Sequence, residues 1–301
     1  MERDVIDLKD ETFDGSFPFI PHYRRIHGFE MHYVDEGSGE PLVLVHGDPT
    51  WSYLWRKLIP PLSQRRRCIA PDHMGMGKSG TPDEPYPYRL RHHIANLETL
   101  LLDLDVRGIT LVLHDWGGPV GLGFAIRHPE RIKRLVLMNT WAFVPWPGGS
   151  FPRLIELIRS ERGEKFVLEK NGYLEPALLG TTTHREHLTE MVLRAYQAPF
   201  PTPGSRRALL CWSRDIPVGE SDPSYAEMKS IEQGLFQFSK TSTLLVWGMQ
   251  DPVLSEPVLR MWQRIYPHAT TYEIADASHF LQEDAPDRIV GCIEEFLDAN
   301  A

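Results

Sequence analysis

Three residues of the sequence could form one catalytic unit: a carboxylate nucleophile, a histidine base and a second carboxylate that orients the histidine. Asp115, Asp251 and His279 each follow a predicted strand. Along the chain they occur in the order nucleophile, acid, histidine, an order known for such triads. In this arrangement His279 would activate water, and Asp251 would fix its tautomer and stabilise the imidazolium.

Asp115 lies in the segment Val112-Leu-His-Asp-Trp-Gly-Gly118, which predicts a strand, a tight turn and a helix. Such a turn lifts one side chain above the sheet and places the next backbone N–H groups at a helix N-terminus, where negative charge is favoured. A carboxylate in this position could attack an sp³ carbon or a strained ring and form an alkyl-enzyme ester. The alternative is that Asp115 only caps the helix that starts near Gly117.

Two further residues are candidates for binding a leaving group that carries negative charge. Trp116 follows Asp115 directly, and its indole N–H is a donor, although the ring could instead pack against the next helix. Asp48 follows a His-Gly dipeptide, at a position that can contribute to an oxyanion pocket. Because a carboxylate repels an anion, Asp48 would have to offer its backbone N–H or have a raised pKa beside Asp115. With Pro49 it could also form only a turn.

The apolar runs alternate with amphipathic stretches, as in an α/β protein. Strands are predicted at 31–35, 41–45, 68–71, 109–113, 132–138, 243–247 and 270–274, and helices at 88–104, 117–127, 257–266 and 286–297. Strands without polar alternation are buried on both faces, which indicates a mostly parallel sheet with helices on both faces. Ligands bind beyond the carboxyl ends of such strands, where Asp115, Asp251 and His279 are expected to lie.

This alternation is interrupted between about residue 141 and residue 238. The segment is rich in proline, glycine and aromatic residues and has helical pieces at 153–159, 186–196 and 205–211. We therefore predict an α-helical cap, residues 141–238, inserted into a core made of residues 1–140 and 239–301. Aromatic side chains in or beside the cap could line an apolar substrate pocket: Trp141, Phe143, Trp146 and Trp212.

Composition and charge argue against several other classes of protein. The formal net charge of −9 and the lack of a basic stripe argue against nucleic acid as a partner. No run approaches the roughly 18 apolar residues that cross a bilayer, and the charged start of the chain has no signal-peptide core. Three cysteines at no metal-ligand spacing fit a reducing compartment. We therefore expect a cytoplasmic protein that acts on neither nucleic acid nor membrane.

The chain resembles the haloalkane dehalogenase family of α/β-hydrolases from about Phe29 to Leu297, and least in the cap. The resemblance is carried by four motifs: His46-Gly-Asp-Pro-Thr-Trp-Ser-Tyr-Leu-Trp-Arg56, Leu113-His-Asp-Trp-Gly-Gly-Pro119, Gly248-Met-Gln-Asp-Pro-Val-Leu254 and Ala277-Ser-His-Phe280. It implies an α/β-hydrolase fold and hydrolysis of a small apolar haloalkane to alcohol and halide. Asp115 would displace the halide, Trp116 would bind it and His279 would drive ester hydrolysis, with no cofactor or metal.

Asp48 departs from the pattern of many dehalogenases. Many members carry Asn at this position as a second halide donor, whereas others carry Glu there and use a tryptophan of the cap instead. A second departure concerns Asn139, which follows the strand ending at Met138. One subfamily keeps its acidic triad residue at that point, so Asn139 supports Asp251 as the acid of this chain.

Dehalogenation is the first hypothesis, and the resemblance leaves alternatives open. The β-lactone decarboxylases of long-chain olefin biosynthesis share the triad, and residues 138–143 and 214–225 resemble their cap borders; Asp115 would then act on a β-lactone and release carbon dioxide and an alkene. Epoxide hydrolases also share the nucleophile but need paired cap tyrosines, for which Tyr173, Tyr196 and Tyr225 are available. A non-catalytic ligand-binding relative is disfavoured because all three triad residues are present.

Overall fold

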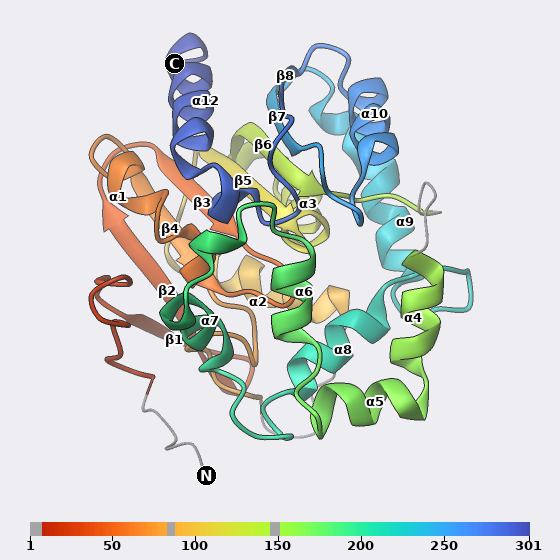
Figure 1. Ribbon diagram of the computed structural model, residues 1–301. Coiled ribbons are helices and arrows are strands. Elements are labelled where there is room, and N and C mark those ends of the chain that lie inside the picture. The colour runs from red at the N-terminus through yellow and green to blue at the C-terminus, as the bar shows by residue number, and fades with distance from the viewer. Residues whose placement is uncertain (1–7, 83–87, 145–150) are drawn as a thin grey trace.

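An eight-stranded sheet forms the centre of the computed structural model, which describes residues 8–82, 88–144 and 151–301 (Figure 1). Its strands are β1 (His22–Ile26), β2 (Phe29–Gly37), β3 (Pro41–Val45), β4 (Arg67–Pro71), β5 (Ile109–Asp115), β6 (Ile132–Thr140), β7 (Ser242–Gly248) and β8 (Thr270–Ile274). Their order is β1-β2-β4-β3-β5-β6-β7-β8. The six strands from β4 to β8 are parallel, and β2 pairs antiparallel with β1 and β4. The prediction of a mostly parallel sheet is confirmed.

The central strands match the predicted apolar runs because both of their faces are covered. All seven residues of β5 are buried, as are the last four of β3 and the last six of β7. Continuous apolar sequence is the signature of such strands. Strand β1 was not predicted, because it is an edge strand with the polar sequence HYRRI, of which only the last residue is buried.

Helices outside the insertion cover the sheet and complete the core. They are α1 (Ile59–Leu62), α2 (Leu90–Asp103), α3 (Gly117–Arg127), α10 (Glu256–Ile265), α11 (Leu281–Asp284) and α12 (Pro286–Ala299). Helix α3 contacts β3, β5, β6 and α2, whereas α1 and α12 contact each other and reach β4 and β7. Within the described residues, no helix combines the length and the apolar character needed to cross a membrane.

The predicted insertion, residues 141–238, contains α4 (Phe151–Arg159), α5 (Glu161–Leu168), α6 (Leu174–Gly180), α7 (Glu190–Gln197), α8 (Arg207–Asp215) and α9 (Tyr225–Gly234). No strand occurs in its described part, 141–144 and 151–238. Helices α4 to α8 lie together at one side of the sheet (Figure 1). Helix α9 instead contacts the core helices α2 and α3. We therefore propose that the covering part of the cap is formed by α4 to α8.

A buried ion pair of the core accepts a hydrogen bond from the insertion. The Glu283 carboxylate accepts two hydrogen bonds from the Arg56 guanidinium, one from Tyr196 of α7 at 2.6 Å and one from Lys57 at 2.9 Å. The Glu283 side chain is 0% exposed. Burial alone would raise its pKa, but the surrounding donors lower the pKa of Glu283 to about 2. The carboxylate is therefore ionised at neutral pH and fixes α7 over the core.

Glu283→Gln is expected to lower the free energy of unfolding by about 3–5 kcal/mol, because it leaves the Arg56 charge buried without its partner. Since the folded pKa lies below the usual 4.5, the stabilisation is present above pH 4.5 and is lost as the pH falls towards about 2. Chemical unfolding at pH 7 and pH 3 measures both effects. Glu161→Gln, at an exposed pair with Lys165, should change stability by less than about 1 kcal/mol. Equal losses in both variants would contradict the prediction.

Candidate active site

Asp115 occupies a strained turn between β5 and α3. Its φ is +50°, in the left-handed region that non-glycine residues rarely adopt. The turn is possible because two glycines lie against it: a Cβ on Gly117 would lie 2.0 Å from the Val45 carbonyl oxygen, and one on Gly47 would lie 2.1 Å from Asp115 Oδ1. The side chain does not cap α3, whose N-cap is Trp116 with no side-chain cap bond. The alternative of a simple capping residue is therefore wrong.

The three residues of the predicted triad come together at the carboxyl ends of β5, β7 and β8. His279 Nε2 lies 3.7 Å from Asp115 Oδ2, and His279 Nδ1 is hydrogen-bonded to Asp251 Oδ2 at 2.8 Å. All three side chains are nearly inaccessible to solvent. The sequence of contacts is carboxylate, imidazole, carboxylate, which suits a nucleophile, a base and an orienting acid.

Asp251 is held in place by donors on both of its oxygens. Oδ1 accepts the backbone N–H groups of Val253 and Leu254, and Oδ2 accepts Asn139 Nδ2 at 2.8 Å. The β5–β6 register shifts next to Asp115, which leaves Asn139 without a partner in β5 and turns its amide towards Asp251. Asn139, whose identity favoured Asp251 as the acid in the sequence analysis, thus donates a hydrogen bond to Asp251.

The loop that carries His279 is fixed by two buried contacts. His114 Nε2 is hydrogen-bonded to the His279 carbonyl oxygen at 2.8 Å, and Asp284 accepts the N–H of Ser278 at 2.7 Å. The same Asp284 carboxylate accepts the N–H of His184 from the insertion. Both contacts go to the backbone of the loop, and they therefore position the imidazole through the loop. Sequence patterns did not single out Asp284, because its role depends on contacts with a distant loop.

The charges of the triad are set by burial and by one another. Burial raises the pKa of Asp115, and His279 together with the backbone N–H groups of Trp116 and Asp48 opposes this rise. Burial alone would lower the pKa of His279, but the carboxylates of Asp251 and Asp115 raise it above its usual value. Burial would likewise raise the pKa of Asp251, yet His279 and the donors around it hold that pKa below its usual range. The arrangement favours an imidazolium between two carboxylates.

The two predicted leaving-group residues both lie beside Asp115. The Asp48 backbone N–H donates to Asp115 Oδ1 at 2.9 Å, and burial raises the pKa of the Asp48 carboxyl to about 8. The raised pKa matches one of the two options weighed for Asp48, whereas its backbone N–H binds the Asp115 carboxylate, and binding of a leaving group by Asp48 stays a prediction. The Trp116 ring packs against Trp141 and Trp212, and its N–H has no hydrogen-bond partner within the described residues. Trp146 lies outside the described part of the chain.

A group of buried histidines beneath the site was missed by the sequence analysis. The ring of His73 contacts those of His46 and His93, and His93 stacks on Trp212 with ring centroids 3.7 Å apart. Burial lowers the pKa of each of these imidazoles, so they are neutral. Among the described residues, no group of three or more His, Cys, Asp and Glu side chains is arranged to hold a metal ion.

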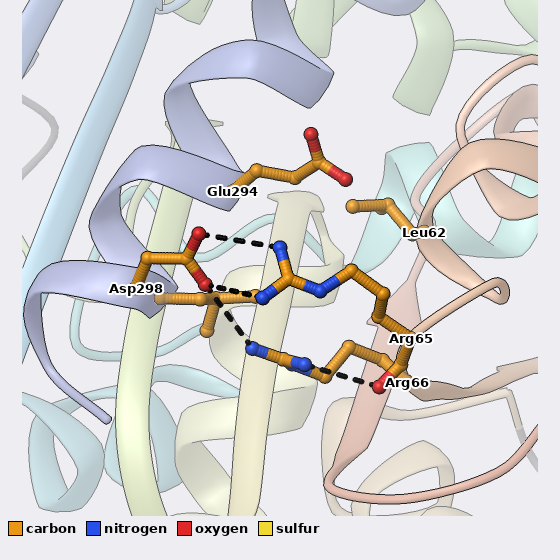
Figure 2. A pocket seen from close by; sticks show the side chains of 6 residues that line it. Leu62, Arg65, Arg66, Glu294 and Asp298 are labelled. Carbon is orange, nitrogen blue, oxygen red and sulfur yellow. Dashed lines mark hydrogen bonds and ion pairs between the residues drawn. The ribbon is translucent and has the colours of Figure 1, made fainter.

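A surface hollow away from the triad does not share its chemistry. It is lined by Leu62, Arg65, Arg66, Glu294, Leu297 and Asp298 (Figure 2). Asp298 pairs with both arginines of the hollow, Arg65 and Arg66. Arg66 directly precedes β4, which places the hollow at the amino ends of the parallel strands, whereas Asp115 lies at their carboxyl ends.

Comparisons with known proteins agree with this geometry. The family model described as alpha/beta hydrolase fold matches residues 40–286. The chain is 39% identical to the cis-3-alkyl-4-alkyloxetan-2-one decarboxylase of Shewanella oneidensis, over 94% of this chain and 90% of that protein. It is 36% identical to the decarboxylase of the same description from Xanthomonas campestris, over 96% and 99% of the two chains.

Haloalkane dehalogenases are similar to nearly the same extent. The enzyme of Sphingobium indicum is 35% identical over 94% of this chain and 97% of its own. The crystal structure of the haloalkane dehalogenase DatA from Agrobacterium tumefaciens C58 superimposes with a TM-score of 0.84 at 30% identity, covering 93% of this chain and 97% of that one. The chain therefore belongs to the α/β-hydrolase family, in the group that contains the haloalkane dehalogenases and the β-lactone decarboxylases related to them.

Proposed function

We propose that this protein decarboxylates a β-lactone that carries two alkyl substituents, with Asp115 as nucleophile, His279 as its cationic partner and Asp251 as the acid that orients His279. The observation that carries the proposal is the position of the Asp115 carboxylate, 3.7 Å from the imidazole of His279, which is hydrogen-bonded to the Asp251 carboxylate. The similarity to two oxetan-2-one decarboxylases supports this substrate class, because an oxetan-2-one is a β-lactone. This proposal places decarboxylation ahead of dehalogenation.

Two steps account for the reaction. The Asp115 carboxylate attacks the sp³ ring carbon that is bonded to the ring oxygen, the bond between this carbon and the ring oxygen breaks, and its electron pair stays on the released carboxylate. The bond between that carboxylate and its carbon then breaks, its electron pair forms the carbon–carbon double bond, and the Asp115 ester bond breaks to regenerate the carboxylate. No water is consumed. Attack with inversion followed by anti cleavage turns a cis lactone into a cis alkene.

His279 has a different task in this reaction from its task in hydrolysis. Because its pKa is raised by Asp251 and Asp115 against the effect of burial, the imidazolium can stabilise Asp115 as it departs. In dehalogenation, the second candidate, His279 would instead deprotonate the water that cleaves the ester. The indole N–H of Trp116, beside Asp115 and without a partner in the described residues, favours this candidate because it could bind a halide.

Epoxide opening is the least supported alternative. Tyr173 donates its hydroxyl hydrogen to Asp48 at 2.7 Å, and Tyr196 donates its own to Glu283 at 2.6 Å. A tyrosine pair that activates an epoxide needs both hydroxyl hydrogens for the substrate oxygen. These two cap tyrosines therefore do not form such a pair.

Parallel assays on the purified protein test the proposal. A cis-3,4-dialkyl β-lactone should give one cis alkene and one carbon dioxide per molecule, as measured by gas chromatography. 1-Bromobutane should release bromide more slowly, and styrene oxide should give no diol. Asp115→Asn serves as the blank for all three. Bromide release without any alkene would overturn the proposal in favour of dehalogenation, and formation of a β-hydroxy acid would indicate simple hydrolysis.

A further inference from the structure

The Asp48 side chain connects the nucleophile to two helices of the insertion. Its backbone N–H donates to Asp115 Oδ1, while its Oδ2 accepts the hydroxyls of Tyr173 at 2.7 Å and Ser213 at 3.0 Å. Its other oxygen, Oδ1, is buried and has no hydrogen-bond partner among the described residues. Tyr173 is the N-cap residue of α6 and Ser213 belongs to α8. An unpartnered buried oxygen on such a constrained carboxyl requires an explanation.

The surroundings of Asp48 favour its neutral form. Burial, helped by the neighbouring Asp115 charge, raises the pKa of Asp48 to about 8, although the hydroxyls of Tyr173 and Ser213 and the imidazolium of His279 oppose the rise. At pH 7 the carboxyl is therefore mostly protonated. Since Oδ2 already receives two hydroxyl hydrogens, the proton belongs on Oδ1. The oxygen that lacks a partner is thus a donor rather than an orphaned acceptor.

We infer that Asp48 works as a neutral carboxylic acid whose Oδ1–H donates a hydrogen bond to the carboxylate released when the β-lactone ring opens. Tyr173 and Ser213 are positioning residues, because they occupy Oδ2 and so direct the proton to Oδ1. The inference rests on the proposed function. Asp48 keeps its proton throughout, so the released carboxylate stays ionised and can lose carbon dioxide.

This assignment accounts for an acid so close to a carboxylate nucleophile. An ionised Asp48 would repel both Asp115 and the carboxylate formed in the reaction, whereas a neutral one stabilises the second. The donor is complete only when α6 and α8 lie over the core, since both hydroxyls come from the insertion.

Infrared difference spectroscopy tests the protonation state without any substrate. The wild type should show the band of a protonated carboxyl that disappears as the pH rises through about 8. Asp48→Asn should lack this band. In Tyr173→Phe the band should persist to higher pH, because the lost hydroxyl had stabilised the ionised form. Absence of a band that depends on Asp48 would overturn the inference. Tyr272→Phe, whose exposed hydroxyl contacts Glu295, is the matched control and should titrate like the wild type.

A second experiment measures kcat/KM for alkene formation between pH 6 and pH 10. The wild-type rate should fall above about pH 8. Asp48→Asn keeps a donor that does not titrate, so any fall that remains comes from the His279 imidazolium, and the midpoint of the fall should move away from about pH 8. Asp48→Ala should lose about 10²- to 10³-fold. An unchanged fall in Asp48→Asn, or full activity in Asp48→Ala, would overturn the inference. A wild type that forms no alkene would instead refute the proposed function, and the infrared result would still decide the state of Asp48.

Discussion

Asp115→Asn should abolish product formation from every substrate, with a loss in kcat/KM of about 10⁴-fold or more. An amide lacks the ionised oxygen that forms the ester, so neither a β-lactone nor a haloalkane can be opened. The fold should be retained, because the Asn oxygen can still accept the Asp48 N–H. The measurement is kcat/KM for alkene and for bromide, together with the unfolding midpoint of each protein.

The matched control for this prediction is Asp298→Asn. Asp298 carries the same functional group in the surface hollow of Figure 2, where its side chain is half exposed and pairs with Arg65. This variant should keep full activity. Asp115→Asn that is folded and retains a tenth of the wild-type rate would contradict the assignment of Asp115 as nucleophile.

His279→Ala should separate the two candidate reactions. Hydrolysis of a haloalkane needs a base to activate water, so turnover should fall by about 10²- to 10⁴-fold and bromide release should stop after one equivalent. Decarboxylation consumes no water, so alkene formation should fall by a smaller factor, which reflects only the lost imidazolium. The measurement compares the bromide burst with steady-state alkene formation in the same enzyme preparation.

A different pattern would argue against this division of roles. Equal losses for the two substrates would mean that His279 takes part in bond breaking in both reactions. Complete retention of bromide turnover would mean that another group activates water. Asp251→Asn should resemble His279→Ala in direction, because it removes the carboxylate that helps to raise the pKa of His279.

The parts of the fold predicted from sequence are those with a strong local signal. Buried parallel strands are continuous apolar runs, so β3 and α3 were predicted with the bounds they have, and β5 and β7 to within two residues. The proximity of the three triad residues was predictable because each follows a predicted strand, although β8, which precedes His279, is an edge strand with only its last residue buried. The turn at Asp115 was also predictable from the sequence, because the adjacent glycines permit close approach of the backbone.

The contacts across the insertion could not be predicted in the same way. Tyr173 lies 125 positions and Ser213 lies 165 positions from Asp48 in the chain. Helical periodicity indicates which face of α6 or α8 is apolar, but it does not indicate which turn lies over which strand end. The hydrogen bond from Tyr196 to Glu283 could not be predicted for the same reason. The sequence thus predicted which residues lie together at the strand ends, but not the contacts that the insertion makes with them.

Peptide mass spectrometry after acid quench tests the central claim most directly. His279→Ala is mixed with 1-bromobutane, the wild type is mixed with a cis-3,4-dialkyl β-lactone, and each is quenched within the first turnover. The account predicts that the peptide containing Asp115 gains a butyl group in the first case and the whole lactone in the second, and that Asp115→Asn gains neither. Product formation with no adduct on this peptide, or an adduct on a different carboxylate, would contradict covalent catalysis by Asp115.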